Sequence, residues 1–340
     1  MSEQLPQPDT TSNVADAQLA QEVTQSAQRY LQAQGVLQPD ELTEQSTVPA
    51  FAVSAPSPTT RPSAQEIRGS YDQSKTVIGR GIINDPHFEM FCLDRGVDIV
   101  NTVKAGAPEY CSALSDYVQG RVAMSREKDG DSLTMTTLGL LAATPNYLYH
   151  QKALNLAREA NQRPPYNSLV AVSSFNGLVR NLATNYPEAK VSDMSAALKQ
   201  MALFFKLPED VSTPGLQSIN KLLVGAQHET GYGQILAASD HQYRSATTAE
   251  DLNGIDYVID EDTDLLTIDV KASLAKIKRE GVTNTSFVCH QSGKVTMWSG
   301  LQTEQFGDKF YIHPSRAAAQ VAIVDSQIER SREANHARMA

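Results

Sequence analysis

The sequence is poor in cysteine, and it lacks both a long apolar segment and an excess of positive charge. Its three cysteines, Cys92, Cys111 and Cys289, are odd in number and far apart, which argues against a disulfide framework or a zinc site and favours a reducing compartment. No window approaches the roughly 18 apolar residues of a membrane span, so no contact with a membrane is predicted. The amino terminus is acidic and does not show the basic-then-apolar order of a signal peptide. We therefore expect a cytoplasmic protein.

The shortage of positive charge limits which partners the protein can bind. The net charge is −10 and it is uneven: residues 1–70 hold eight acidic and three basic residues, and residues 215–331 hold fifteen acidic and ten basic residues. Nucleic-acid-binding surfaces are commonly basic. Any contact with DNA or RNA must therefore rest on a local patch of positive charge.

The first 70 residues have the composition of a disordered acidic tail. They are rich in Gln, Ser, Thr, Pro and Ala and poor in aromatic residues. Within the tail, residues 14–34 space their apolar side chains along one side of a short helix, which either docks on a partner or forms only transiently. The tail, or the helical domain that follows it, is where we expect a protein partner to bind.

Two further regions are predicted after the tail. Residues 71–213 carry helical spacing of apolar residues, separated by Gly, Pro and Asn, and predict a helical domain without recognisable chemistry. Residues 214–331 predict a mixed α/β domain with a helix over 214–238, strands over 254–259, 265–272, 285–290 and 294–299, and a final helix over 314–331. Residues 332–340 are a short tail.

Two strand candidates of the second region contain charged residues that an apolar strand would not need. If the polar connection EDTD is a hairpin loop, Asp260 pairs with Leu265 and Asp256 then lies opposite Asp269. Opposite residues of an antiparallel pair point to the same face. One face would carry Asp256, Thr267, Asp269 and Lys271, and the other would be apolar, with Ile255, Tyr257, Ile259, Leu266, Ile268 and Val270.

Two carboxylates across a ladder repel each other, and a divalent cation removes this conflict. Carboxylate oxygens suit Mg²⁺ or Mn²⁺, which take one or two carboxylates together with water and substrate phosphate. A lysine beside the metal can orient or deprotonate a water and can stabilise a phosphorane-like transition state. Asp256, Asp269 and Lys271 therefore predict hydrolysis of a phosphodiester.

A third carboxylate is expected from the preceding helix. Its apolar stripe runs through Leu216, Ile219, Leu222, Leu223 and Ala226, and Glu229 continues that stripe. A glutamate is unexpected on a buried stripe, so Glu229 either faces the hairpin or is a partly exposed residue near the end of the stripe.

Glu229 on a helix, Asp256 in a strand after GI, and Asp269-Val270-Lys271 in the next strand resemble the PD-(D/E)xK nuclease superfamily. This superfamily includes restriction endonucleases, Holliday-junction resolvases and RecB-type exonucleases. The resemblance covers residues 214–331, and Ile255 stands where the proline of the motif would be. It implies a restriction-endonuclease-like mixed sheet flanked by helices, here preceded by the helical domain and the tail.

The resemblance also implies roles for individual residues. Asp256, Asp269 and the backbone carbonyl of Val270 would bind Mg²⁺ or Mn²⁺, Glu229 would assist, and Lys271 would act on the attacking water. The expected activity is that of a metal-dependent endo- or exonuclease acting on DNA. Weaker candidates for substrate binding are Lys276, Lys278, Arg279, His290, Gln291 and Lys294. A solvated helix face explains the first three, which are basic, equally well.

Three other interpretations remain open from the sequence. The nuclease-like fold could be a non-catalytic module that binds nucleic acid or protein, the enzyme could be a metal-dependent hydrolase of another substrate, or the charges could belong to an ordinary surface hairpin with a salt bridge.

Overall fold

The structure is a computed structural model, and it describes residues 61–97, 106–261, 264–273, 286–290 and 292–339. The chain divides into two units, Met1–Ala50 and Phe51–Ala340, and all of the described residues belong to the second. The helix predicted over residues 14–34 and most of the predicted tail therefore lie outside the described residues. So do Lys276, Lys278, Arg279 and Gln291.

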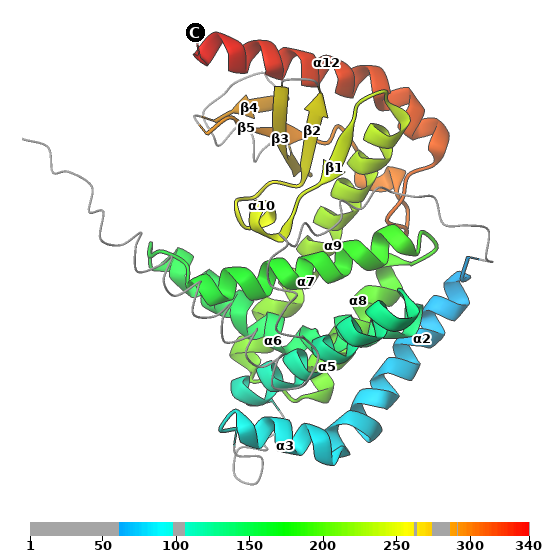
Figure 1. Cartoon of the computed structure of the whole chain (residues 1–340), viewed down its shortest axis with the longest axis vertical. Helices are drawn as coiled ribbons and strands as arrows, with labels where there is room; N and C mark the ends of the chain where they lie inside the picture. Colours follow the sequence, from blue (N-terminus) through cyan, green and yellow to red (C-terminus); the bar gives the residue numbers. More distant parts are fainter. Residues whose placement is uncertain (1–60, 98–105, 262–263, 274–285, 291, 340) are drawn as a thin grey trace, which may run out of the picture. The chain divides into compact units, whose positions relative to one another are not determined.

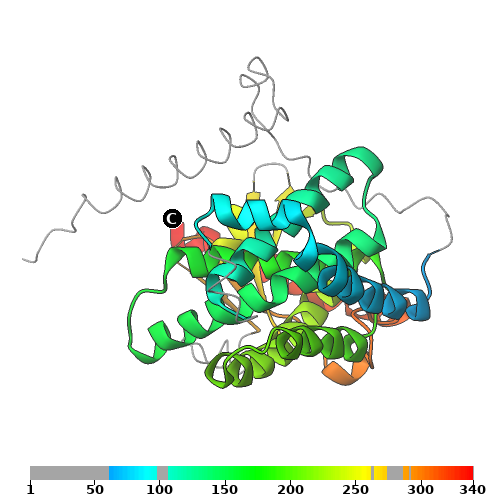
Figure 2. The ribbon, with the colours of Figure 1, turned by 90° about the horizontal axis from the view of Figure 1, so that it is seen from below.

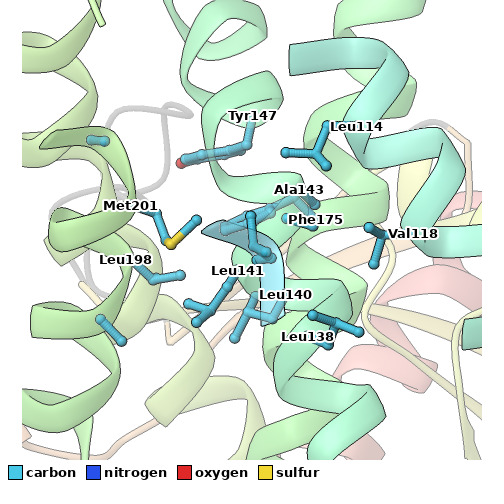
Figure 3. Packing of buried hydrophobic residues seen from close by; sticks show 14 of the residues in the cluster. Leu114, Val118, Leu138, Leu140, Leu141, Ala143, Tyr147, Phe175, Leu198 and Met201 are labelled. Carbon is cyan, nitrogen blue, oxygen red and sulfur yellow. The ribbon is translucent and has the colours of Figure 1, made fainter. Parts of the chain in front are cut away.

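The first part of the described chain is helical. Its elements are α2 (Ala64–Thr76), the π-helical turn η1 (Val77–Gly81), the 3-10 turn η2 (Ile82–Asn84), α3 (Pro86–Asp94), α5 (Pro108–Asp129), α6 (Leu133–Glu159), α7 (Tyr166–Asn185), α8 (Val191–Phe204) and α9 (Glu209–Ala238). Helix α6 is central, because it contacts α2, α5, α7, α8 and α9 (Figure 1 and Figure 2). Leu140, Leu141 and Leu148 of α6 are fully buried (Figure 3 labels the first two). Burial of this apolar helix against its neighbours forms the larger of two hydrophobic cores.

Local capping signals explain where two of these helices begin. Ser63 and Glu66 form a reciprocal capping box at the start of α2. Asp85 caps α3, whose first residue is Pro86. The tail boundary predicted at residue 70 therefore lies inside α2.

The second part contains a five-stranded mixed sheet. Its strands are β1 (Tyr243–Ser245), β2 (Tyr257–Glu261), β3 (Asp264–Lys271), β4 (Phe287–Cys289) and β5 (Lys294–Trp298). They are ordered β1-β2-β3-β5-β4; β3 and β5 are parallel and the other neighbours are antiparallel. The short helices α10 (Thr248–Leu252) and η3 (Thr303–Gln305) and the final helix α12 (Pro314–Met339) complete a mixed α/β, mostly helical fold (Figure 1). Within the described part of the chain, no helix is both long and apolar enough to cross a bilayer.

The predicted register of the central hairpin is confirmed. Val258 pairs with Thr267, and Asp260 pairs with Leu265. The apolar face predicted from the alternation packs into the second hydrophobic core through five of its members, Tyr257, Ile259, Leu266, Ile268 and Val270. The opposite face therefore carries Asp269 and Lys271, as expected from the period of two in a strand.

Helix α9 links the two cores. Ile219, Leu223 and Ala226 pack in the larger core, which is helical, whereas Ile235 and Leu236 pack in the second core with the apolar residues of the sheet. The domain boundary predicted between residues 213 and 214 therefore lies inside α9, and the boundary predicted at residue 331 lies inside α12. The helical part and the sheet are parts of one compact unit.

Glycine lets α9 approach the sheet closely. A Cβ atom on Gly233 would lie 2.5 Å from the hydroxyl of Tyr257, and one on Gly231 would lie 2.7 Å from atoms of Leu301 and Phe306. The Tyr257 hydroxyl cannot easily yield, because its ring is buried and it donates a 2.8 Å hydrogen bond to the carbonyl oxygen of Glu229.

We expect Gly233→Ala to lower the free energy of unfolding by about 1–3 kcal/mol, because the added methyl group must displace Tyr257. The matched control is Gly120→Ala in α5, where a Cβ atom meets nothing within 4 Å and alanine favours the helix by up to about 1 kcal/mol. Urea unfolding of both variants measures the difference. A Gly233→Ala variant as stable as Gly120→Ala would contradict the close packing of α9 on β2.

Candidate functional site

Asp256 directly precedes β2, at a bulge where the β2–β3 ladder ends. Its backbone N–H donates to the carbonyl oxygen of Ile268 at 2.7 Å, and its Oδ2 accepts a 2.7 Å hydrogen bond from the backbone N–H of Val270. Since Tyr257 also pairs with Ile268, two successive residues oppose Ile268, and the predicted backbone pairing of Asp256 with Asp269 is not part of the ladder. Both residues are nearly buried, at 8% and 6% exposure. The two predicted acids nevertheless line one pocket.

Three polar side chains surround the Asp269 carboxylate. Lys271 donates a hydrogen bond to Oδ1. The Lys294 ammonium lies 3.6 Å from Oδ2, and the Thr296 hydroxyl lies 3.4 Å from the same oxygen. The parallel pairing of β3 with β5 explains the last two contacts, because it places Thr296 beside Asp269 and Lys294 beside Thr267.

Glu229 reaches this face from α9. Tyr257 holds the backbone at this point through its hydrogen bond to the Glu229 carbonyl oxygen, and the side chain is one-quarter exposed. Glu229 lines the same pocket of about 230 Å³ as Asp256, Asp269, Val270 and Lys271. The structure thus brings together the four side chains predicted to carry catalysis, along with the Val270 backbone.

An arginine from the helical part completes the site. Arg180 of α7 lies with Nη1 3.8 Å from Asp256 Oδ1 and 3.9 Å from Glu229 Oε2, and its Nη2 donates a 2.7 Å hydrogen bond to Asp251 of α10. Asp251 also accepts a hydrogen bond from the Ser173 hydroxyl of α7. The site is therefore assembled from α7, α9, α10 and the sheet.

The charges of the site are nearly balanced. Among the described residues, the acids Glu229, Asp251, Asp256 and Asp269 are paired with the cations Arg180, Lys271 and Lys294. When all seven groups are ionised, the site carries a net charge of −1. A divalent cation would bring that charge to +1, which suits binding of a phosphate.

Two carboxyl groups of the site hold their protons more tightly than usual. Burial raises the pKa of Asp256 well above its ordinary value, and repulsion from Glu229 and Asp269 adds to the effect. Burial also raises the pKa of Glu229, although the nearby Arg180 guanidinium opposes that shift. Perturbed acids in a pocket are typical of functional sites.

Arg180 and Lys271 keep their charge. Burial disfavours the ammonium of Lys271, but attraction to Asp269 and their hydrogen bond outweigh it and raise its pKa. The pKa of Arg180 is likewise raised, because attraction to Glu229, Asp251 and Asp256 exceeds the cost of burial. Lys271 is therefore an ammonium at neutral pH.

The donor set fits a hard divalent cation in its chemistry. Carboxylate oxygens from Asp256, Asp269 and Glu229 are the ligands that Mg²⁺ and Mn²⁺ prefer. In the described residues, however, no three His, Cys, Asp or Glu side chains are grouped closely enough to hold a metal ion. Arg180 and Lys271 lie against these carboxylates instead. The acids would have to leave these partners to coordinate a metal together.

Sequence reasoning missed Arg180 and Asp251. Arg180 occurs in an amphipathic helix, where arginine ordinarily faces solvent. Asp251 lies in α10, a five-residue helix within a stretch expected to be a polar connection, and it follows the capping-box residue Glu250. Lys294 is a candidate for substrate binding in the sequence, and the structure places its ammonium beside Asp269.

Comparisons with protein-family models, with curated proteins and with solved structures found no match to this chain.

We expect Asp256→Asn to raise the free energy of unfolding of the metal-free protein near neutral pH, because it removes a buried negative charge from a site with an excess of one. An acid whose pKa is raised by folding destabilises the fold progressively as the pH rises through that pKa. The gain should therefore vanish below about pH 4, where aspartate is protonated in both states.

Urea unfolding in the presence of a chelator, at several pH values, measures this difference. The control is Asp260→Asn on β2, an exposed position where we expect a change within about 0.5 kcal/mol. An Asp256→Asn variant less stable than the wild type at neutral pH would show that Asp256 is held mainly by its cationic partner.

Proposed function

We propose that the protein is a metal-dependent nuclease that hydrolyses phosphodiester bonds, with DNA as the substrate. One observation carries this proposal: the carboxylates of Glu229, Asp256 and Asp269 and the ammonium of Lys271 line one recessed pocket. They come from α9, from the start of β2 and from β3. Three acids and an amine gathered from separate elements are typical of phosphodiester hydrolysis with a divalent cation.

The order of the elements supports a restriction-endonuclease-like fold as part of the proposal. A long helix bearing Glu229 precedes an antiparallel hairpin bearing Asp256 and Asp269, and a parallel strand then joins the sheet beside β3. Helices α9 and α12 contact the sheet and each other. The resemblance to the PD-(D/E)xK nuclease superfamily implies a mixed sheet with helices packed on it, and this order of elements is consistent with it.

Each residue has a distinct role in the proposed reaction. A bound Mg²⁺ or Mn²⁺ would supply Lewis acidity and lower the pKa of a bound water. Asp256 and Asp269, with the carbonyl of Val270, would hold it, and Glu229 would hold its water shell. Lys271 would act as an ammonium that donates a hydrogen bond to the attacking water and stabilises the developing negative charge, since its raised pKa keeps it protonated.

A second candidate function is favoured by the ion pairs themselves. Arg180 Nη1 lies near both Glu229 and Asp256, and Lys271 is bonded to Asp269. These two cations of the chain thereby neutralise carboxylates that a nuclease would use to bind a metal ion. A nuclease-like fold that binds nucleic acid or another protein without cleaving it would keep these pairs permanently.

Cleavage by a Lys271→Ala variant separates the two candidates. We expect the wild type to degrade plasmid or oligonucleotide DNA with Mg²⁺ or Mn²⁺ and to be inactive with a chelator. Loss of the Lys271 ammonium should lower the rate by about 10²–10⁴-fold, as is usual for a group that assists proton transfer or stabilises charge.

The matched control is Lys221→Ala, which removes an exposed lysine of α9 and should leave the rate unchanged. Cleavage that survives Lys271→Ala undiminished would place the activity elsewhere. A wild-type protein inactive on DNA and RNA with both metals would favour the non-catalytic function.

A further inference from the structure

A large groove adjoins the pocket of the acids. Its volume is about 1330 Å³, which exceeds the roughly 300–1,000 Å³ of pockets for small ligands. Ser173, Arg180 and Asp251 line both the groove and the pocket. A ligand lying in the groove would therefore reach the candidate site past the Arg180 guanidinium.

Helix α7 forms one side of the groove with a polar face. Ser173, Gly177, Asn181 and Thr184 recur at helical spacing and line the groove, whereas Phe175, Val179 and Leu182 face the core. The Oδ1 atom of Asn181 is buried without a hydrogen-bond partner in the described structure.

Gly177 leaves open space in the middle of this face. A Cβ atom built on Gly177 meets no atom within 4 Å, apart from the helix's own backbone and chain neighbours. Glycine costs an α-helix roughly 0.5–1 kcal/mol relative to alanine, and no close packing of the protein requires it here. A larger side chain at this position would extend into the groove that Gly177 lines.

Positive charge is locally in excess around the groove. Arg61, Arg180, Lys309 and Arg316 line it together with three acids, Asp131, Glu188 and Asp251. Two of these acids are engaged by groove cations, since Arg180 pairs with Asp251 and Lys309 with Glu188. In a chain of net charge −10, the described groove lining has an excess of one positive charge, the sign that binding of a phosphodiester needs.

We propose that this groove binds a single-stranded segment of nucleic acid and leads it to the acids, an inference that rests on the proposed nuclease function. The Asp256 and Asp269 side chains are only 11% and 8% exposed. A flexible single strand can carry a phosphate down to carboxylates so deeply recessed, whereas the backbone of a stiff duplex stays at the surface. Hydroxyl, amide and guanidinium groups of the groove are donors that track a phosphate backbone.

The test places a larger side chain in the groove and measures binding of nucleic acid under conditions in which a metal-dependent enzyme does not cleave it. Fluorescence anisotropy in the presence of a chelator reports binding of labelled oligonucleotides of about 12 nucleotides, as single-stranded DNA, single-stranded RNA and duplex DNA. Gly177→Leu should weaken binding of the single strands by at least about tenfold. Gly177→Ala is the control and should bind as the wild type does, and the melting temperatures of both variants verify folding.

A second pair of variants tests the groove through charge. Removing one side chain that neutralises a phosphate should reduce the slope of log affinity against log salt by about 0.7 for a single strand. Arg316→Ala should show this reduction, whereas Arg158→Ala, an exposed arginine of α6 outside the groove, should not.

Unchanged binding in Gly177→Leu, or tighter binding of duplex than of single strands, would overturn the groove proposal. Because the measurement needs neither metal nor cleavage, its outcome is independent of the nuclease activity. Weakened binding in Gly177→Leu, for a protein that cuts nothing, would support the groove and contradict the proposed catalysis. The two single-stranded probes show whether the bound strand is DNA or RNA.

Discussion

Asp256 and Asp269 line one pocket while almost buried, and the repulsion between their carboxylates is the constraint on which the site depends. Carboxylates in such positions need a counter-charge, because the low dielectric strengthens repulsion and removes the hydration that would relieve it. The protein supplies Arg180, Lys271 and Lys294. The charge of the site is thereby almost balanced, and the residual negative charge lies where a divalent cation could bind.

The counter-charge ties the helical part to the sheet. Arg180 belongs to α7, and Asp251, with which it pairs, belongs to α10, so the pocket is closed only where the helical part meets the sheet. Helix α9 also connects the helical part to the sheet, because its two halves pack in different cores and Glu229 lies between the two halves. Neither part would form the site alone.

The sequence predicted the strands and helices in which apolar residues recur at a regular spacing, and it missed the elements that lack such a spacing. Alternation of apolar residues gave the register of β2 and β3, and the stripe of α9 pointed Glu229 toward the hairpin; both agree with the structure. The short strand β1 and the helix α10 have too few residues to show a period. The tail boundary missed α2 because its start depends on the Ser63 and Glu66 capping box rather than on apolar spacing.

The sequence revealed residues of the site only where a charged residue occurs in a segment whose apolar residues are expected to be buried. Asp256 and Asp269 occur within apolar strand segments, and Glu229 continues the apolar stripe of a helix, which marks all three in the sequence. Arg180 interrupts nothing that the sequence reveals, since an arginine on a helix is ordinarily exposed. Its role follows from the packing of α7 against α10, which joins residues far apart in the chain. The role of a residue that depends on such long-range contacts can be recognised only from the structure.

Anomalous diffraction from crystals soaked in Mn²⁺ tests the central claim most directly. The account predicts an anomalous peak within about 2.5 Å of carboxylate oxygens of both Asp256 and Asp269, with the Arg180 guanidinium moved away from Asp256. Absence of a peak at saturating Mn²⁺, with Arg180 still beside Asp256 and Glu229, would contradict it and identify the chain's own cations as the permanent partners of these acids.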